Sequence, residues 1–205
     1  YDINSGTKNL VLSTYTPQRI DVYENNIYWT SVDTSYGATF LNKYNITNGT
    51  SSILDEGRSY SNSDNYTPDD ISVYGGKIYG VDAGSDSLFE YGLDGGEKKL
   101  LQYASYPYSL FATSNYIYWS NNNGSETFLM RTGLDFNNSE QLFTRSSANN
   151  TGNINDVYVT SDYIYWTDGH NNKIMKCDLD GNNVETVLSS GSNPFKLSVT
   201  QDKIY

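Results

Sequence analysis

Ile164-Tyr165-Trp166-Thr167-Asp168 is the clearest copy of a short phrase that recurs along the chain. Altered or shortened copies stand at Ile27-Tyr28-Trp29, Ile78-Tyr79-Gly80, Ile117-Tyr118-Trp119 and Ile204-Tyr205. The copies are about 40 to 50 residues apart, which is typical of a repeat architecture. The chain is therefore predicted to consist of similar structural units in series.

An apolar residue stands seven and five positions before each of these isoleucines. The pairs are Ile20 and Val22, Ile71 and Val73, Leu110 and Ala112, Val157 and Val159, and Leu197 and Val199. Such alternation predicts a strand with one buried face, so we expect all five pairs to be buried between units. Three residues before a pair comes each of the four prolines, Pro17, Pro68, Pro107 and Pro194, where a strand is about to begin.

A second predicted hairpin follows the phrase in each unit. In the fourth unit its two strands flank the turn Asp180-Gly181-Asn182-Asn183, and in the second unit they flank Asp94-Gly95-Gly96. Four short strands in a repeat of about 40 to 45 residues indicate a propeller blade. The predicted fold class is all-β: a β-propeller of four-stranded antiparallel blades.

Tyr-Trp-Thr-Asp at 165–168, followed by Ile174, Asp178, Leu179, Asp180 and Gly181, resembles the YWTD repeat of low-density-lipoprotein-receptor class B propellers and their bacterial relatives. The resemblance covers the whole chain and is strongest in 154–205. The scarcity of cysteine points to a microbial relative. The residues that carry the repeat motif are Ile27, Tyr28, Trp29, Ile78, Tyr79, Asp82, Ile117, Tyr118, Trp119, Ile164, Tyr165, Trp166 and Asp168.

The resemblance has implications for role and location. In that family the aspartate of the motif helps to tie neighbouring blades together, which implies the same role for Asp168 and Asp82. The resemblance also favours an extracellular or cell-surface location.

The repeat divides the chain, as a single propeller domain 1–205, into four complete blades at about 20–70, 71–109, 110–155 and 156–195. Residues 1–19 match the outer half of a blade and 196–205 the inner half, so we expect a fifth blade divided between the two ends. Both ends fall inside predicted strands, where unpaired backbone groups would be left at an edge. We therefore expect these residues to be part of a longer chain, in which the propeller could be larger.

Composition narrows the classes of partner. The formal net charge of −11 and a pI near 4.3 disfavour a nucleic-acid partner. No run of 18 apolar residues is present, so direct membrane insertion is not expected. The 20 tyrosines suit pleated, half-buried surfaces with an apolar body and a polar tip. The sequence describes an acidic, tyrosine-rich, all-β protein.

Residues that could carry catalysis are few. His170 is the only histidine and lies in a predicted loop, where it is expected to be solvated, and Cys177 occupies the core position that Tyr91 holds in the second unit. A general base needs a nucleophile and an orienting partner, and the sequence offers no such set. No catalytic residue is predicted, and the chain is not expected to be an enzyme.

Acidic clusters raise the question of a bound cation. The run Asp178-Leu179-Asp180-Gly181-Asn182 resembles part of a calcium loop, although the full pattern needs further oxygen ligands and a distant Glu. Asp64, Asp69 and Asp70 near a blade entrance could also hold a cation. The alternative for the first run is an ordinary hairpin turn, and the alternative for the second group is that its carboxylates only keep the protein soluble. No metal site or cofactor is predicted, and calcium is the open alternative.

Two classes of function fit the sequence. The first is a non-catalytic binding or scaffold propeller that contacts a protein, a glycan or copies of itself through loops containing Tyr60, Tyr66, Tyr106 and Tyr108. The second is a channel-centred, metal-dependent hydrolase or lactonase, which would need inward-facing ligands at one depth. Equivalent strand positions hold Asp21, Ser72, Phe111, Tyr158 and Ser198, which do not form a ligand set. The sequence therefore favours binding.

Overall fold

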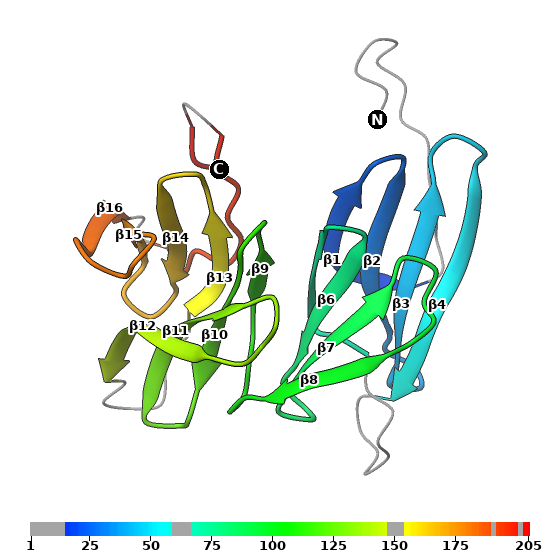
Figure 1. The fold of residues 1–205 in the computed structure, drawn as a ribbon, viewed down its shortest axis with the longest axis horizontal. Coiled ribbons are helices and arrows are strands. Elements are labelled where there is room, and N and C mark those ends of the chain that lie inside the picture. The colour runs from blue at the N-terminus through cyan, green and yellow to red at the C-terminus, as the bar shows by residue number, and fades with distance from the viewer. Residues whose placement is uncertain (1–14, 59–66, 147–153, 190–191, 201–202) are drawn as a thin grey trace.

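A computed structural model of the 205-residue chain describes residues 15–58, 67–146, 154–189, 192–200 and 203–205 (Figure 1). These residues form four separate four-stranded antiparallel sheets, which we call blades 1 to 4 in chain order. The described part of the chain contains no helix, and hence none long and apolar enough to cross a membrane. The predicted all-β propeller of four-stranded blades is confirmed.

Each blade is a meander in which consecutive strands are neighbours. Blade 1 comprises β1 (Thr16–Tyr23), β2 (Asn26–Asp33), β3 (Ala38–Asn45) and β4 (Thr50–Arg58). Blade 2 comprises β5 (Asp70–Tyr74), β6 (Lys77–Asp82), β7 (Ser87–Gly92) and β8 (Lys99–Tyr103). Blade 3 comprises β9 (Leu110–Ala112), β10 (Tyr116–Asn122), β11 (Glu126–Gly133) and β12 (Ser139–Ser146). Blade 4 comprises β13 (Ile154–Val159), β14 (Tyr163–Asp168), β15 (Lys173–Asp178) and β16 (Glu185–Ser189).

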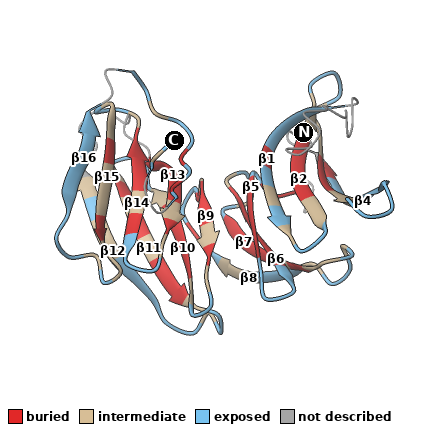
Figure 2. Cartoon of the chain, turned by 90° about the horizontal axis from the view of Figure 1, so that it is seen from above, coloured by how far each residue is buried: buried red, intermediate tan, exposed pale blue. Residues whose placement is uncertain are grey.

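The first strands of the blades stand next to one another around the middle of the molecule (Figure 2). β1 contacts β5, β5 contacts β9, and β9 contacts β13, whereas β13 and β1 are not in contact within the described chain. On the side of blade 4, Ser198 and Tyr205 exchange backbone hydrogen bonds, and Val199 bridges to Ile204. The described part of 196–205 is thus a short hairpin. The outer half-blade expected at 1–19 lies mostly outside the described residues.

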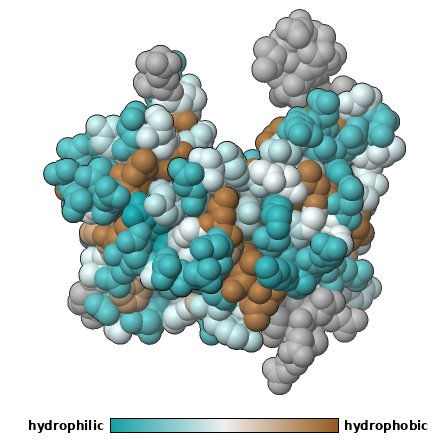
Figure 3. All heavy atoms as spheres, in the orientation of Figure 1, coloured by the Kyte–Doolittle hydropathy of each residue, from teal (hydrophilic) through white to brown (hydrophobic). Residues whose placement is uncertain are grey.

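The tryptophans of the repeated phrase occupy equivalent places in second strands. Trp119 is fully buried in an apolar cluster shared by blades 2 and 3, and the ring of Trp166 lies 5.1 Å from that of Phe143 in blade 3. Trp29 is also buried. In blade 2 the place belongs to Gly80, where a Cβ would lie 2.5 Å from the Cγ of Pro68. Figure 3 shows hydrophobic residues at the surface between the pair formed by blades 1 and 2 and the pair formed by blades 3 and 4.

Four of the five apolar pairs are buried as expected, and the first is not. Ile71 is 5% exposed, whereas its equivalent Ile20 is 69% exposed and Val22 is 57% exposed. The buried pairs pack against the preceding blade; Ile71 and Val73, for example, share a cluster with Tyr28 of blade 1. Nothing in the described chain covers β1 in this way. The prediction for Ile20 and Val22 was wrong because it assumed a preceding blade.

The prolines also differ at the first blade. Pro68 and Pro107 precede β5 and β9, as predicted, and Pro194 precedes the segment in which Val199 bridges to Ile204. Pro17 lies inside β1, at a register shift between Pro17 and Arg19. A bulge tolerates a residue without an N–H donor. The expectation that Pro17 would stand before the strand was therefore wrong, because Pro17 is the second residue of β1.

The same kind of polar contact occurs at two of the blade junctions. In blade 1 the ammonium of Lys43 lies 2.7 Å from Oδ1 of Asp94, in the turn between the third and fourth strands of blade 2. In blade 3, Nη1 of Arg131 lies 3.2 Å from Oδ1 of Asp180 in the equivalent turn of blade 4. The two cations are equivalent by register, because Lys43 pairs with Tyr28 and Arg131 with Tyr118. We call this contact the turn latch.

A glycine is required after each latch aspartate for two reasons, its positive φ angle and its close approach to the preceding blade. Gly95 and Gly181 have φ angles of 88° and 79°, a region that L side chains rarely adopt. A Cβ on Gly181 would lie 2.6 Å from the carbonyl oxygen of Leu142 in blade 3, and one on Gly95 would lie 2.6 Å from that of Leu54. These turns therefore press directly on the preceding blade.

The junction between blades 2 and 3 is different. Phe136 takes the place of the latch glycine, with φ of 57°, and its ring lies 6.5 Å from that of Tyr79 in blade 2. Glu90 stands where the latch cation would be and pairs with Lys77 of its own blade. This junction is thus closed by an apolar contact instead of a latch.

Candidate binding surfaces

The blades present two different ends. The first, which we call the loop face, carries the segments between blades and the turns between second and third strands. The opposite end, the hairpin face, carries the turns between first and second and between third and fourth strands. Loops on a rigid scaffold are where binding residues usually lie, so both faces are candidates.

Between the faces, side chains on the first strands tie each blade to the next. Oδ2 of Asp21 accepts the N–H of Val73 at 2.6 Å, and Oγ of Ser72 accepts the N–H of Ala112 at 3.2 Å. Burial raises the pKa of the Asp21 carboxyl above its usual value, against the hydrogen bonds from the N–H groups of Val73 and Val22. These oxygens satisfy backbone donors that the free inner edge of a sheet would leave unpaired.

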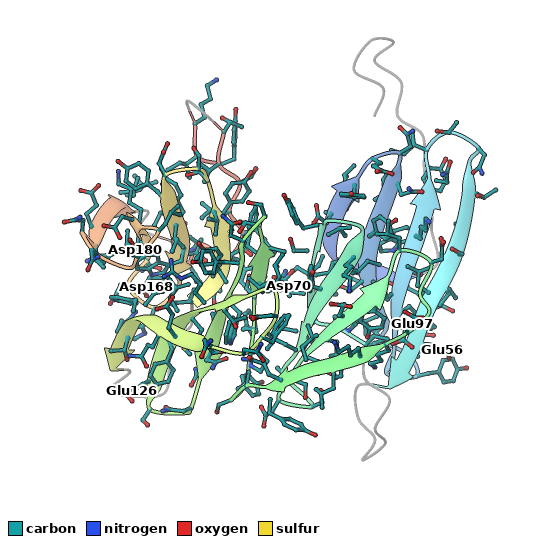
Figure 4. All side chains as sticks on the ribbon, viewed as in Figure 1. Glu56, Asp70, Glu97, Glu126, Asp168 and Asp180 are labelled. Atoms are coloured by element: carbon teal, nitrogen blue, oxygen red, sulfur yellow. The ribbon has the colours of Figure 1, made fainter. Side chains whose placement is uncertain are left out.

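A second row of ties lies nearer the loop face. Oδ2 of Asp70 accepts the N–H of Leu110 at 3.2 Å, and Oδ2 of Asp156 accepts that of Leu197 at 2.7 Å. Asp70 lies between the two halves of the molecule (Figure 4). Burial raises the pKa of Asp70, and the charges of Lys196 and Arg19 oppose that shift. Nε of Arg19 is 3.2 Å from Oδ1 of Asp70. The buried carboxylates of the first strands thus hold neighbouring blades together by accepting their backbone N–H groups.

The aspartates of the repeated phrase have separate roles. Asp168 pairs with Arg145 of blade 3 and also accepts the N–H of Asn171 in its own turn, so it does connect two blades. Asp82 accepts the N–H groups of Gly84 and Ser85 in its own turn. Its described hydrogen bonds stay within blade 2.

The residues considered for chemistry are dispersed. His170 is exposed in the turn after β14, and Cys177 is buried in β15, paired with Ile164 as Tyr91 is with Ile78. Asp178 accepts the N–H groups of Asp180 and Asn182, which folds the turn itself. In the described ranges, no three His, Cys, Asp or Glu side chains are grouped to hold a metal ion. Asp64 lies outside those ranges.

The loop face is rich in exposed aromatic side chains. Tyr36 is 84% exposed in the turn between β2 and β3, and the others are Tyr15, Tyr103, Tyr106 and Phe195. Their positions follow from topology, because each lies in a segment between blades, at the loop-face end of a strand or in a turn between second and third strands. The hairpin face carries two exposed tyrosines in its described part, Tyr74 and Tyr163.

At the centre of the loop face, aromatic rings surround a hollow of about 220 Å³. Tyr108 meets Phe195 edge to face, with 6.5 Å between ring centroids, and the guanidinium of Arg19 lies 5.4 Å from the centroid of Phe195. Tyr106 and Pro68 also line the hollow. The structure thus brings the predicted binding residues Tyr106 and Tyr108 together, while Tyr60 and Tyr66 lie outside the described residues.

A larger cavity of about 810 Å³ opens toward the hairpin face. It is lined by the equivalent first-strand residues Asp21, Ser72, Phe111 and Tyr158, and by Arg131 among others. Sequence reasoning recognised these equivalent positions but judged them only as a metal-ligand set. The signal it passed over is the change from polar to aromatic residues along the row.

The comparisons with known proteins bear on the fold. No family model matches the chain, and no curated protein matches it. A solved structure described as a nidogen/laminin complex is similar with a TM-score of 0.77 and 16% identity, covering 93% of this chain and 71% of that one. A putative TolB from Agrobacterium tumefaciens is similar with a TM-score of 0.59 and 13% identity, covering 80% of this chain and 61% of that one. At these identities the likeness shows a β-propeller fold.

Proposed function

We propose that this chain is a non-catalytic binding propeller whose loop face engages a protein partner in an extracellular or cell-surface setting. The observation that carries the proposal is the concentration of exposed aromatic residues on that face: Tyr106 and Phe195 line a central hollow, and Tyr36 is exposed in the turn between β2 and β3. Tyrosine supplies a large contact area with few rotatable bonds and is enriched where proteins recognise one another.

Two further points support the proposal. The propeller of the nidogen/laminin structure belongs to a protein–protein complex, by its description. Carboxylates on the first strands accept hydrogen bonds from backbone N–H groups of the next blade, as Asp21, Asp70 and Asp156 do. These groups serve cohesion between blades, which favours a scaffold over the alternative of a channel-centred hydrolase or lactonase.

The proposal can be tested by site-specific photo-cross-linking. A benzophenone amino acid is placed at Tyr36 on the loop face and, as a matched control, at Tyr163 on the hairpin face; both tyrosines are exposed. Cross-linking is performed with cell-surface protein from the source organism. We expect a discrete protein adduct from position 36, none from 163, and loss of the adduct when Tyr106→Ala is added.

Equal adducts from both positions, or adducts unaffected by Tyr106→Ala, would contradict a loop-face partner. The enzymatic alternative is examined separately with lactone and ester substrates. Turnover by the folded protein that disappears in His170→Ala would show catalysis and overturn the non-catalytic assignment.

A further inference from the structure

The equivalent first-strand side chains that face the larger cavity are polar in blades 1 and 2 and aromatic in blades 3 and 4. Asp21 and Ser72 each accept a backbone N–H from the following blade, those of Val73 and Ala112. The next member of the row is Phe111, whose ring offers no acceptor oxygen. The N–H of Val159, which is equivalent to those of Val73 and Ala112, is therefore left without this tie.

The register directs that N–H toward the cavity. Val159 lies opposite Ile164, and the adjacent pair is closed by a hydrogen bond from the N–H of Thr160 to the carbonyl of Tyr163. Hydrogen-bonded and non-bonded pairs alternate in an antiparallel ladder, so Val159 and Ile164 form a non-bonded pair. The N–H of Val159 consequently points away from β14, to the side on which the cavity lies.

Aromatic rings stand beside this donor. The rings of Phe111 and Tyr158 are 4.8 Å apart with an interplanar angle of 52°, and both residues are half-buried in the cavity wall. Around them the rim carries the side chains of Ser114 and Asn115. It also carries the hydroxyls of Thr113, Thr160 and Ser161, which donate their hydrogens within the chain and offer their oxygens as acceptors. A ligand would thus meet flat apolar faces below and hydrogen-bonding groups at the edge.

The charged groups of the cavity already have partners. Nε of Arg131 donates to Glu140 at 2.7 Å, and its Nη1 lies 3.2 Å from Asp180. Asp21 accepts the N–H groups of Val73 and Val22. A charged ligand would therefore be desolvated without a free counter-charge, and a wholly apolar one would strip water from the polar rim. Neither class fits this lining.

We propose that the cavity on the hairpin face binds a neutral saccharide. A pyranose ring has apolar C–H faces that pack on the electron-rich faces of Phe111 and Tyr158, and hydroxyls on its perimeter that reach the rim. One hydroxyl oxygen accepts the N–H of Val159. The volume of about 810 Å³ admits more than one sugar ring. This site lies at the opposite end of the blades from the proposed protein-binding face and does not depend on it.

The test uses the whole chain and three neutral probes, cellotetraose, mannotetraose and β-1,4-galactotetraose, with tetralysine as a cationic comparison. Binding is followed by calorimetry and by amide chemical shifts. We expect at least one tetrasaccharide to bind with a Kd between about 1 μM and 1 mM. The amide signal of Val159 should shift on titration, while that of Val73, which is tied to Asp21, should not.

Phe111→Ser is the decisive variant, because it supplies the hydroxyl that Ser72 provides at the preceding junction. It is expected to keep the blades tied yet weaken saccharide binding at least tenfold, whereas Tyr36→Ala on the loop face should leave binding unchanged. The wild-type Val159 shift tests the site even if this variant does not fold. The proposal is overturned if no tetrasaccharide binds at about 10 mM, if the shifts fall away from the cavity, or if tetralysine alone binds there.

Discussion

Arg131 in β11 and Asp180 in blade 4 are joined across the junction between their blades, with 3.2 Å between Nη1 and Oδ1. Arg131 also donates to the carbonyl of Leu179 and lies over the ring of Tyr116, 4.5 Å from its centroid. The same cation therefore holds its own sheet and the turn of the next one. At the first junction, Lys43 and Asp94 make the ion-pair part of this contact.

The first prediction compares the two partners of that latch. Arg131→Ala should destabilise the protein by about 2 kcal/mol, because a nearly buried guanidinium loses several charge-assisted hydrogen bonds. Asp180→Ala should cost about 0.5 kcal/mol, because the Asp180 side chain is largely exposed. Urea unfolding of both variants and of the double variant measures this. Equal costs would mean that the latch depends on charge alone and not on the packing of Arg131.

The second prediction concerns the glycine of the latch turn. Gly181 and Gly76 have nearly the same φ, 79° and 80°, but only Gly181 faces an obstacle, since no atom lies within 4 Å of a Cβ on Gly76. Gly76→Ala should cost about 1 kcal/mol from backbone strain, and Gly181→Ala at least 1 kcal/mol more because its Cβ meets the Leu142 carbonyl. Thermal unfolding decides. Similar losses for both would show that blade 3 shifts to accommodate the added Cβ without a loss of free energy of unfolding.

The third prediction contrasts two equivalent isoleucines. Ile71→Ala should destabilise by about 2–5 kcal/mol, because it removes packing between blades 1 and 2. Ile20→Ala should change stability by less than about 0.5 kcal/mol, since Ile20 is largely exposed. Chemical denaturation of the two variants provides the measurement. A large loss for Ile20→Ala would reveal that something covers β1 in solution.

The fourth prediction is that the free energy of unfolding falls at alkaline pH because the buried Cys177 thiol holds its proton only in the folded state. Burial, helped by the charge of Asp178, raises the pKa of the Cys177 thiol from 9.0 to about 12. The folded state therefore holds its proton where the unfolded state releases it, so this contribution is complete below pH 9 and is lost as pH rises toward 12.

Urea unfolding of wild type and Cys177→Ala across this range provides the measurement. The wild type should lose up to about 1.4 kcal/mol per pH unit more than the variant. The tyrosines are common to both proteins and cancel in the comparison. Parallel pH profiles for the two would contradict a protonated, buried thiol.

Much of the fold could be predicted from local patterns. The alternation at Val157 and Val159 and the phrase Ile164-Tyr165-Trp166 predict strands from their own residues, and both segments form strands, which blade 3 then buries. The exposure of Ile20 could not be predicted in this way. It depends on what stands beside β1, and the residue pattern of β1 is the same as that of its buried equivalents.

The candidate sites were less accessible to sequence reasoning for a related reason. Tyr106 and Tyr108 were proposed from their own loop, and the structure adds Phe195, which is distant in sequence and completes the hollow. The latch between Lys43 and Asp94 joins residues 51 positions apart, and neither stands out locally. The cavity beside Phe111 becomes evident only when hydrogen bonds made by Asp21 and Ser72 are compared with their equivalents.

The uneven distribution of ion pairs among the junctions has a consequence for the order in which the blades separate. Within the described chain, ion pairs join blade 1 to blade 2 and blade 3 to blade 4, but none joins blade 2 to blade 3. Repeat proteins unfold according to the strength of each interface between neighbours. Sodium chloride screens the latches, whose aspartates are exposed, and should weaken the two outer junctions, whereas sulfate strengthens apolar burial at the middle one. The choice of salt would thus decide which blades separate first, and amide hydrogen exchange would follow that order.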